Sequence, residues 1–195
     1  MKKLWIFGLT VMLALALACC GGSSGSSNEG SNEVEPDTWY SVTSLQQLDG
    51  TWKGMYSDTK TLKKWYEDNG NTWTSEDQEI FGDMILRIDI ELLFLINASA
   101  GTRSGSQKLT ETFSGGKINE IWEDLKSGEL DGPGITIDDS KHSASLTDNF
   151  GPEPFSEDDL NVAQINQYGT KVRMRADDLG YEGLLSEYII FIKES

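Results

Sequence analysis

The chain of 195 residues contains only two cysteines, Cys19 and Cys20, which stand side by side near its start. No disulfide can form within the rest of the chain, so its folded stability must come from a hydrophobic core. Histidine is equally scarce, because His142 is the only one. A zinc site usually draws its ligands from several cysteines and histidines. These scarcities predict a domain with neither a disulfide nor a zinc centre.

Positive charge is also in short supply. The chain has 16 lysines and arginines against 32 aspartates and glutamates, which gives a net charge of −16. An acidic surface of this size repels nucleic-acid phosphates and anionic lipid headgroups. We therefore exclude nucleic acid as a partner, and we exclude membrane attachment through a basic patch.

Recognisable catalytic patterns are missing as well. The sequence has no Gly-x-Ser-x-Gly motif and no glycine loop with the spacing of a phosphate site. His142 lies in a turn beside Asp138 and Asp139, where we expect it to be solvated. The run 68–71 resembles a calcium loop only faintly, because its glycine stands at the third place and not the sixth. A hydrolase with two carboxylates stays an alternative, but no pair is singled out. We assign no catalytic residue, no metal and no cofactor.

The first residues have the layout of a secretory signal. Lys2 and Lys3 give a positive start, and the 15 residues from Leu4 to Ala18 are uncharged and mostly apolar. A helix needs roughly 20 apolar residues to cross a bilayer core. The run is therefore too short for a permanent membrane span and predicts a cleaved segment over 1–18.

The segment Ala16-Leu17-Ala18-Cys19 resembles a bacterial lipobox. The resemblance implies cleavage before Cys19 and acyl chains such as palmitate on that cysteine, two or more of which make membrane attachment stable. It also implies a place in the bacterial cell envelope, at the outer membrane more than the inner, with the domain in the periplasm or at the cell surface. The lipobox prefers leucine where Ala16 stands, and Leu17 is in register with Cys20. Cys20 is therefore the alternative anchor, and an ordinary cleaved signal peptide is the other alternative.

Cleavage would remove residues 1–18 and leave two parts with different composition. Losing Lys2 and Lys3 reduces the 16 basic residues to 14 against 32 acidic ones, so the mature net charge is −18. Residues 19–38 are mostly Gly, Ser, Asn and Glu after the cysteines, which cannot bury apolar area, and we expect a disordered tether with a reach of roughly 20–25 Å. Residues 39–195 have the size of a single domain.

Alternating polarity predicts strands over most of this domain. The strongest pattern covers 85–96, where apolar residues occupy every second position. Leu93 and Leu95 interrupt the polar side of that pattern, so we expect the far end of the strand to be covered on both faces. A Gly/Ser-rich turn is expected over 100–106. The eight predicted strands are 51–56, 85–96, 108–113, 134–138, 143–148, 161–166, 171–176 and 187–193.

Helical spacing interrupts the strands in three places. We expect one helix between Thr59 and Gly70, a short turn from Ser75 with a capping box at Gln78, and an amphipathic helix over 117–126. Eight antiparallel strands in chain order favour an up-and-down barrel, because closure removes the exposed edges of the sheet. The predicted fold is thus mainly β, an eight-stranded antiparallel barrel with short inserted helices, and a β-sandwich is the alternative.

Gly50-Thr51-Trp52 resembles the Gly-x-Trp mark at the start of the first strand of lipocalin-like domains. The tail over 165–171 and 188–193 resembles the closing hairpin and last strand of bacterial lipocalin-like lipoproteins. The resemblance implies that Trp52 closes the barrel floor and that Arg173 or Arg175 lies over its ring. The helical stretches after the first strand and over 117–126 depart from the family pattern.

Two functions follow from these expectations. The first is a non-enzymatic binding protein for a small apolar ligand, with a pocket lined by inward residues of the barrel. The second is an envelope or surface module with a filled core that binds another protein through exposed tryptophans. The pocket candidates are Ile88, Ile90, Leu92, Phe94, Val172 and Met174, and the anchor candidates are Trp65, Trp73 and Trp122.

Overall fold

The computed structural model describes residues 37–68, 70–128, 130, 132–155, 160–179 and 188–194. The predicted signal segment 1–18, the anchor candidates Cys19 and Cys20, and the tether up to residue 36 lie outside the described residues. Within the described part, no helix is long and apolar enough to span a membrane.

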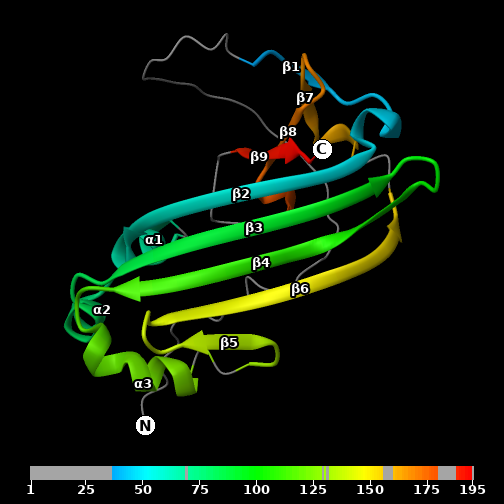
Figure 1. Cartoon of the computed structure of the whole chain (residues 1–195). Coiled ribbons are helices and arrows are strands. Elements are labelled where there is room, and N and C mark those ends of the chain that lie inside the picture. The colour runs from blue at the N-terminus through cyan, green and yellow to red at the C-terminus, as the bar shows by residue number, and fades with distance from the viewer. Residues whose placement is uncertain are drawn as a thin grey trace.

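The described strands form one antiparallel sheet of nine strands. Four of them are long and run side by side across the molecule (Figure 1). The strands are β1 (Trp39–Ser41), β2 (Gly50–Thr61), β3 (Ile85–Asn97), β4 (Thr102–Ser114), β5 (Ile135–Asp138), β6 (Ser143–Pro154), β7 (Gln164–Asn166), β8 (Lys171–Arg175) and β9 (Tyr188–Lys193). The helices are η2 (Leu45–Leu48), α1 (Leu62–Asp68), α2 (Ser75–Phe81), α3 (Ile118–Gly128) and η3 (Asp177–Leu179).

The strand order is β1-β7-β8-β9-β2-β3-β4-β6-β5. Most neighbouring strands in this order also follow one another along the chain, and the last strand, β9, returns to pair with β2. The arrangement would be a closed ring if β6 paired with β7, but these two strands are not paired. The two edges that closure would join are taken by short strands, β5 on β6 and β1 on β7. The prediction of a closed eight-stranded barrel is therefore wrong, and so is the two-sheet alternative for the described residues. The mainly-β prediction is confirmed.

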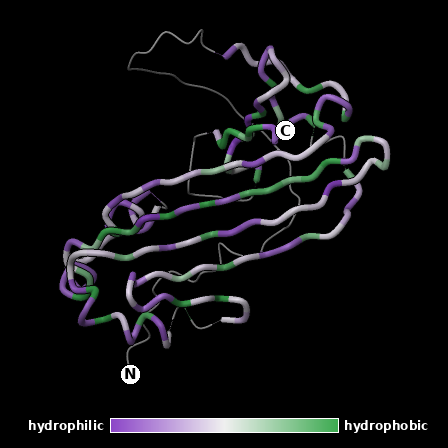
Figure 2. Tube along the Cα trace, in the orientation of Figure 1, coloured by the Kyte–Doolittle hydropathy of each residue, from purple (hydrophilic) through white to green (hydrophobic). Residues whose placement is uncertain are grey.

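The long strands arise where polarity alternates. β3 pairs with β2 over 12 positions and with β4 over 13. Its even-numbered apolar residues are buried, apart from the half-buried Phe94, while most odd-numbered ones are exposed. Such alternation is the pattern of a sheet with one packed face. Figure 2 shows the apolar residues concentrated in the second half of β3.

The helices α1, α2 and α3 lie at the end of the sheet where β3 begins and β4 ends (Figure 1). The indole of Trp65 on α1 is buried and donates a hydrogen bond to the carbonyl of Leu86, at 2.9 Å. The helix α2 is capped by Thr74 and Asp77 and not by Ser75 and Gln78 as expected. Fixed in this way, the helices close one end of the hydrophobic core.

Candidate functional site

Alternation divides the sheet into two faces. The inner face carries Trp52 of β2, Ile90 of β3 and Phe191 of β9, all of which are buried. The outer face carries the residues between them, such as Lys53 and Ile192, which are paired across β2 and β9. These two names are used below in this sense.

The predicted pocket residues lie on the inner face. Five of the six are buried in the main hydrophobic cluster, namely Ile88, Ile90, Leu92, Val172 and Met174. The sixth, Phe94, is half-buried and stacks against Phe150 and Phe191, with ring centroids 5.7 and 5.3 Å apart. The residues expected to line a pocket therefore pack with other described side chains as core.

Trp52 lies at the start of β2, where the sequence resemblance placed it. Its ring is buried, and its Nε1 donates a hydrogen bond to the carbonyl of Leu48 at 2.6 Å. The cation over this ring is Lys193, whose Nζ is 5.3 Å from the centroid. The expectation that Arg173 or Arg175 fills this role is wrong, because β8 pairs with β9 and not with β2, and the last residue of β9 comes between them.

One acid faces the inner side of the sheet. Glu111 of β4 is paired with Ile88 of β3 and Ala144 of β6, and both of these neighbours are buried. Loss of hydration raises the pKa of Glu111 from 4.5 to about 7. This half-buried carboxyl therefore changes charge close to neutral pH.

The outer face carries a continuous set of exposed aliphatic side chains. We call these five residues the apolar patch, and they come from the neighbouring strands β9, β2 and β3. The expectation that Leu93 and Leu95 are covered is therefore wrong among the described residues, because the helices α1, α2 and α3 lie at the other end of the sheet. The members and their exposed fractions are Met55 64%, Leu93 41%, Leu95 50%, Ile190 45% and Ile192 58%.

Lys53 lies in the middle of the apolar patch. It is paired with Leu93 on β3 and with Ile192 on β9, and Met55 follows it on the same face of β2. Its side chain has no ion pair or hydrogen bond with any residue that the structure describes, and the same holds for the exposed Glu91, which is paired with Met55. Glu91 also has Lys108 of β4 as its cross-strand neighbour, but no ion pair joins these two side chains. The patch thus contains a lysine and a glutamate that form no ion pair with any described residue.

A shallow depression of about 410 Å³ adjoins the patch. Within it Arg87 donates two hydrogen bonds of 2.8 Å to the carboxylate of Asp89, and the Ser57 hydroxyl donates a third to the same carboxylate. The hydrogen bonds from Arg87 lower the pKa of Asp89, so this pair stays charged and internally neutralised. Met55, Glu91 and Lys108 complete the border of the depression.

A cation stacked between two aromatic rings borders the other side of the patch. The guanidinium carbon of Arg173 is 4.7 Å from the ring centroid of Trp39 and 4.3 Å from that of Tyr188. Its Nε also donates to Oε1 of Gln164 at 2.7 Å. These contacts join β1, β8 and β9 and hold Arg173 beside Ile190, its cross-strand neighbour.

The tryptophans expected as exposed anchors are placed differently. Trp65 and Trp122 are buried, and Trp73 is half-buried against Phe81 with ring centroids 5.8 Å apart, so the expectation of exposed anchors is wrong. His142 is half-exposed in its turn and meets the edge of the Trp122 ring at 5.2 Å.

Asp139, which the sequence predicts to be a solvated turn residue, accepts hydrogen bonds from two side chains of α3. It accepts hydrogen bonds from Nε1 of Trp122 at 2.8 Å and from Nζ of Lys126 at 2.7 Å, and the Lys126 bond lowers its pKa most. These contacts hold α3 against the turn after β5. Among the described residues, no three histidine, cysteine or carboxylate side chains gather as metal ligands would.

Sequence reasoning missed the apolar patch because it treated Leu93 and Leu95 as buried on both sides. The signal that could have found it is Ile190 and Ile192, which break the alternation of β9 in the same way. The patch forms because β3 and β9, which pair with β2 on its two sides, each carry two aliphatic residues on a face that is otherwise polar. Comparison of the chain with models of known protein families, with curated proteins and with solved structures finds no match.

Proposed function

We propose that the chain is an exported protein, anchored to a bacterial envelope membrane by lipid on Cys19, and that its sheet binds a protein partner through the outer face. The observation that carries the proposal is the apolar patch. Its five aliphatic side chains adjoin one another on three paired strands and are 41–64% exposed. Contiguous apolar surface of this kind marks interaction sites, whereas single exposed aliphatic residues are normal.

The energetics favour a covered patch. Full burial of a Leu, Ile or Met side chain from water is worth about 1.5–3 kcal/mol. The five members are about half exposed, so a partner that covers them would gain several kcal/mol before the entropy of association is subtracted. The charged depression and the Arg173 stack on either side would form the polar rim that such interfaces have.

The position of the first described residue is compatible with a partner on the outer face. Asp37, the first described residue, binds Nζ of Lys171 at 2.7 Å, and Lys171 is paired with Ile192 of the patch. The proposed lipid tether would therefore enter the domain at the border of the outer face. A partner in the same envelope could then reach the patch within the span of the tether.

We also propose that the sheet is an opened relative of the lipocalin-like arrangement. The support is its order, in which β2, β3, β4 and β6 follow the chain and β9 returns to pair with β2. A buried Trp52 at the start of β2 with a cation over its ring supports the same relation.

A small apolar ligand on the inner face is the second candidate function. The observation that favours it is Glu111, a carboxyl without a hydrogen bond to any described residue, set between the apolar neighbours Ile88 and Ala144. An apolar ligand with one polar end would satisfy such a group. Native mass spectrometry of the full chain, purified in detergent from its own organism, would show a retained mass that disappears on denaturation.

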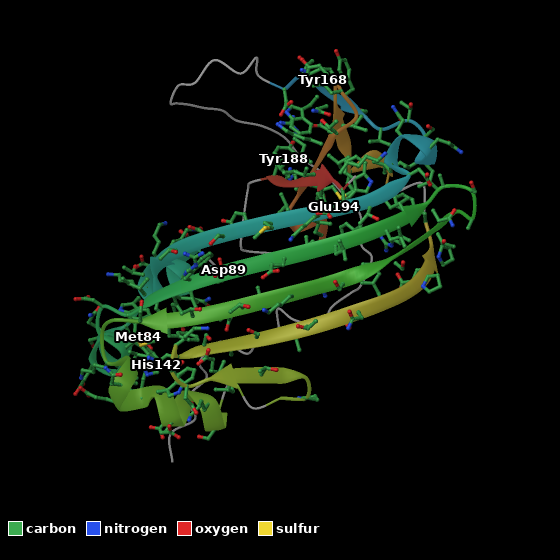
Figure 3. The ribbon with its side chains drawn as sticks, in the orientation of Figure 1. Met84, Asp89, His142, Tyr168, Tyr188 and Glu194 are labelled. Carbon is green, nitrogen blue, oxygen red and sulfur yellow. The ribbon has the colours of Figure 1, made fainter. Side chains whose placement is uncertain are left out.

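Site-specific photo-crosslinking tests the main proposal. A benzophenone amino acid replaces Met55 in the full chain, produced in the organism from which the sequence derives. The matched control replaces Tyr168, which has the same 64% exposure but lies in the turn after β7, away from the patch (Figure 3). Irradiation should give discrete protein adducts from position 55 and few from position 168. Equal labelling at both positions, or no adduct from position 55, would contradict the proposal.

A further inference from the structure

We propose that the partner seated on the outer face is a second copy of this chain, related by a two-fold axis that runs along the line from Met55 to Leu93. This inference rests on the proposed function, because it names the occupant of the same face. It is carried by the arrangement of four side chains on the two central strands of the patch.

The four residues form a rectangle on the outer face. Lys53 is paired with Leu93, and Met55 is paired with Glu91. Paired side chains lie about 5 Å apart, and alternate residues along a strand about 7 Å apart. The two aliphatic residues therefore occupy one diagonal, and the lysine and the glutamate occupy the other.

A two-fold axis along the aliphatic diagonal makes this rectangle self-complementary. Met55 and Leu93 would each pack against their equivalents in the second copy, as residues on the axis of an isologous interface do. Lys53 would meet Glu91 of the second copy, and Glu91 would meet its Lys53. One symmetry operation thus creates two ion pairs and buries the apolar centre between them.

Charge complementarity favours a second copy over an unrelated protein. Lys53 and Glu91 are both exposed, and neither has a partner among the residues that the structure describes. A foreign surface would have to present a carboxylate and a cation at the matching spacing, whereas a second copy does so by symmetry. The neighbouring charges Arg87 and Asp89 already neutralise each other. Lys108 of β4 is paired with Glu91 across the strands but forms no ion pair with it, so the Glu91 carboxylate is still available to the second copy.

The net charge of the chain sets the conditions under which the dimer forms. Two copies of the mature chain, with 14 basic against 32 acidic residues and so a net charge of −18 each, repel one another at low ionic strength. At about 0.15 M salt the Debye length is about 8 Å, so repulsion between distant charges is screened, while Lys53 and Glu91 in contact are screened much less. We expect tighter association at 0.15 M salt than at 0.01 M.

A charge-swap experiment tests the inference. The full chain is purified in detergent at 0.15 M salt, and native mass spectrometry measures the ratio of dimer to monomer over a dilution series. The wild-type chain should form a dimer. K53E and E91K should each weaken it by about tenfold or more, because like charges then oppose each other. K53E/E91K should restore it to within about twofold. The control is K63E, which makes the same charge change on α1, outside the patch.

Three results of the charge-swap experiment would contradict the inference. A wild-type chain that stays monomeric, single variants that dimerise as well as the wild type, or a double variant as weak as the singles would overturn the inference. All three substituted residues are exposed, and circular dichroism of each variant verifies that the sheet is intact.

The two proposals can fail separately. Adducts of position 55 with a different protein, combined with a monomeric purified chain, would leave the proposed function standing and remove the second copy. Adducts of twice the chain mass would support both. An absence of adducts from position 55 would remove both.

Discussion

Replacing Glu111 by glutamine should change how the stability of the fold depends on pH. Glu111 lies on the inner face between buried Ile88 and Ala144, and desolvation raises its pKa from 4.5 to about 7. The folded chain therefore holds this proton more tightly than the unfolded chain between about pH 4.5 and 7. Over that range the free energy of unfolding falls as the pH rises, and above pH 7 the folded chain bears the full cost of the buried charge.

The size of the effect follows from the pKa. A rise of the Glu111 pKa from 4.5 to about 7 corresponds to about 3 kcal/mol of free energy, since a pKa shift of one unit is worth about 1.36 kcal/mol. The side chain keeps some contact with solvent, which screens its charge, so we expect about 1–3 kcal/mol at pH 8. Glutamine stays neutral at every pH. E111Q should therefore be more stable than the wild type at pH 8 and close to it at pH 4.5.

Urea unfolding of the full chain in mild detergent, followed by tryptophan fluorescence at pH 4.5, 6, 7 and 8, measures this difference. Glu120, an exposed acid on α3, provides the control variant E120Q, whose difference from the wild type should not grow with pH. A constant difference between E111Q and the wild type across the pH range would refute the reasoning, because it would show that residue 111 does not titrate near neutral pH.

Two further predictions concern packing and anchoring. A Cβ added at Gly54 would lie 2.6 Å from the ring of Phe191, so G54A should lower the free energy of unfolding by about 1–3 kcal/mol, whereas G151A, which meets nothing within 4 Å, should change it little. Equal urea midpoints for the two variants would contradict this. C19S should move the chain from the membrane fraction to the soluble fraction and remove its acyl mass, while C20S should not. Soluble C20S with membrane-bound C19S would move the anchor by one residue.

Most of the strands could be predicted from the sequence because alternation is a local signal. The helix over 117–126 and the strand over 85–96 match α3 and β3 to within two residues. The turn expected over 100–106 is mostly strand instead, because β3 extends to Asn97 and offers its partner β4 a complete ladder of hydrogen bonds. The strand β1 has only three residues and no alternation to reveal it.

Closure and the candidate site depend on contacts that the sequence does not show. The sheet stays open between β6 and β7 because β5 occupies the free edge of β6. The residues 135–138 and 143–146 have the pattern of an ordinary β-hairpin, which does not reveal that their pairing blocks closure. The apolar patch depends on which faces the helices cover. Leu93 and Leu95 are exposed because α1, α2 and α3 lie at the other end of the sheet, and the sequence of β3 alone does not determine where those helices pack.

Oxidation of Met55 in intact cells tests the central claim, that a partner covers the outer face, most directly. An exposed methionine is readily oxidised to its sulfoxide, and Met55 is 64% exposed in the single chain. Mass spectrometry can follow its oxidation in cells and in a dilute, detergent-solubilised sample, with the buried Met174 as the slow reference in both. We predict that Met55 oxidises several-fold more slowly in cells than in the dilute sample, relative to Met174. Equal relative rates would mean that the outer face stays bare, which contradicts the account.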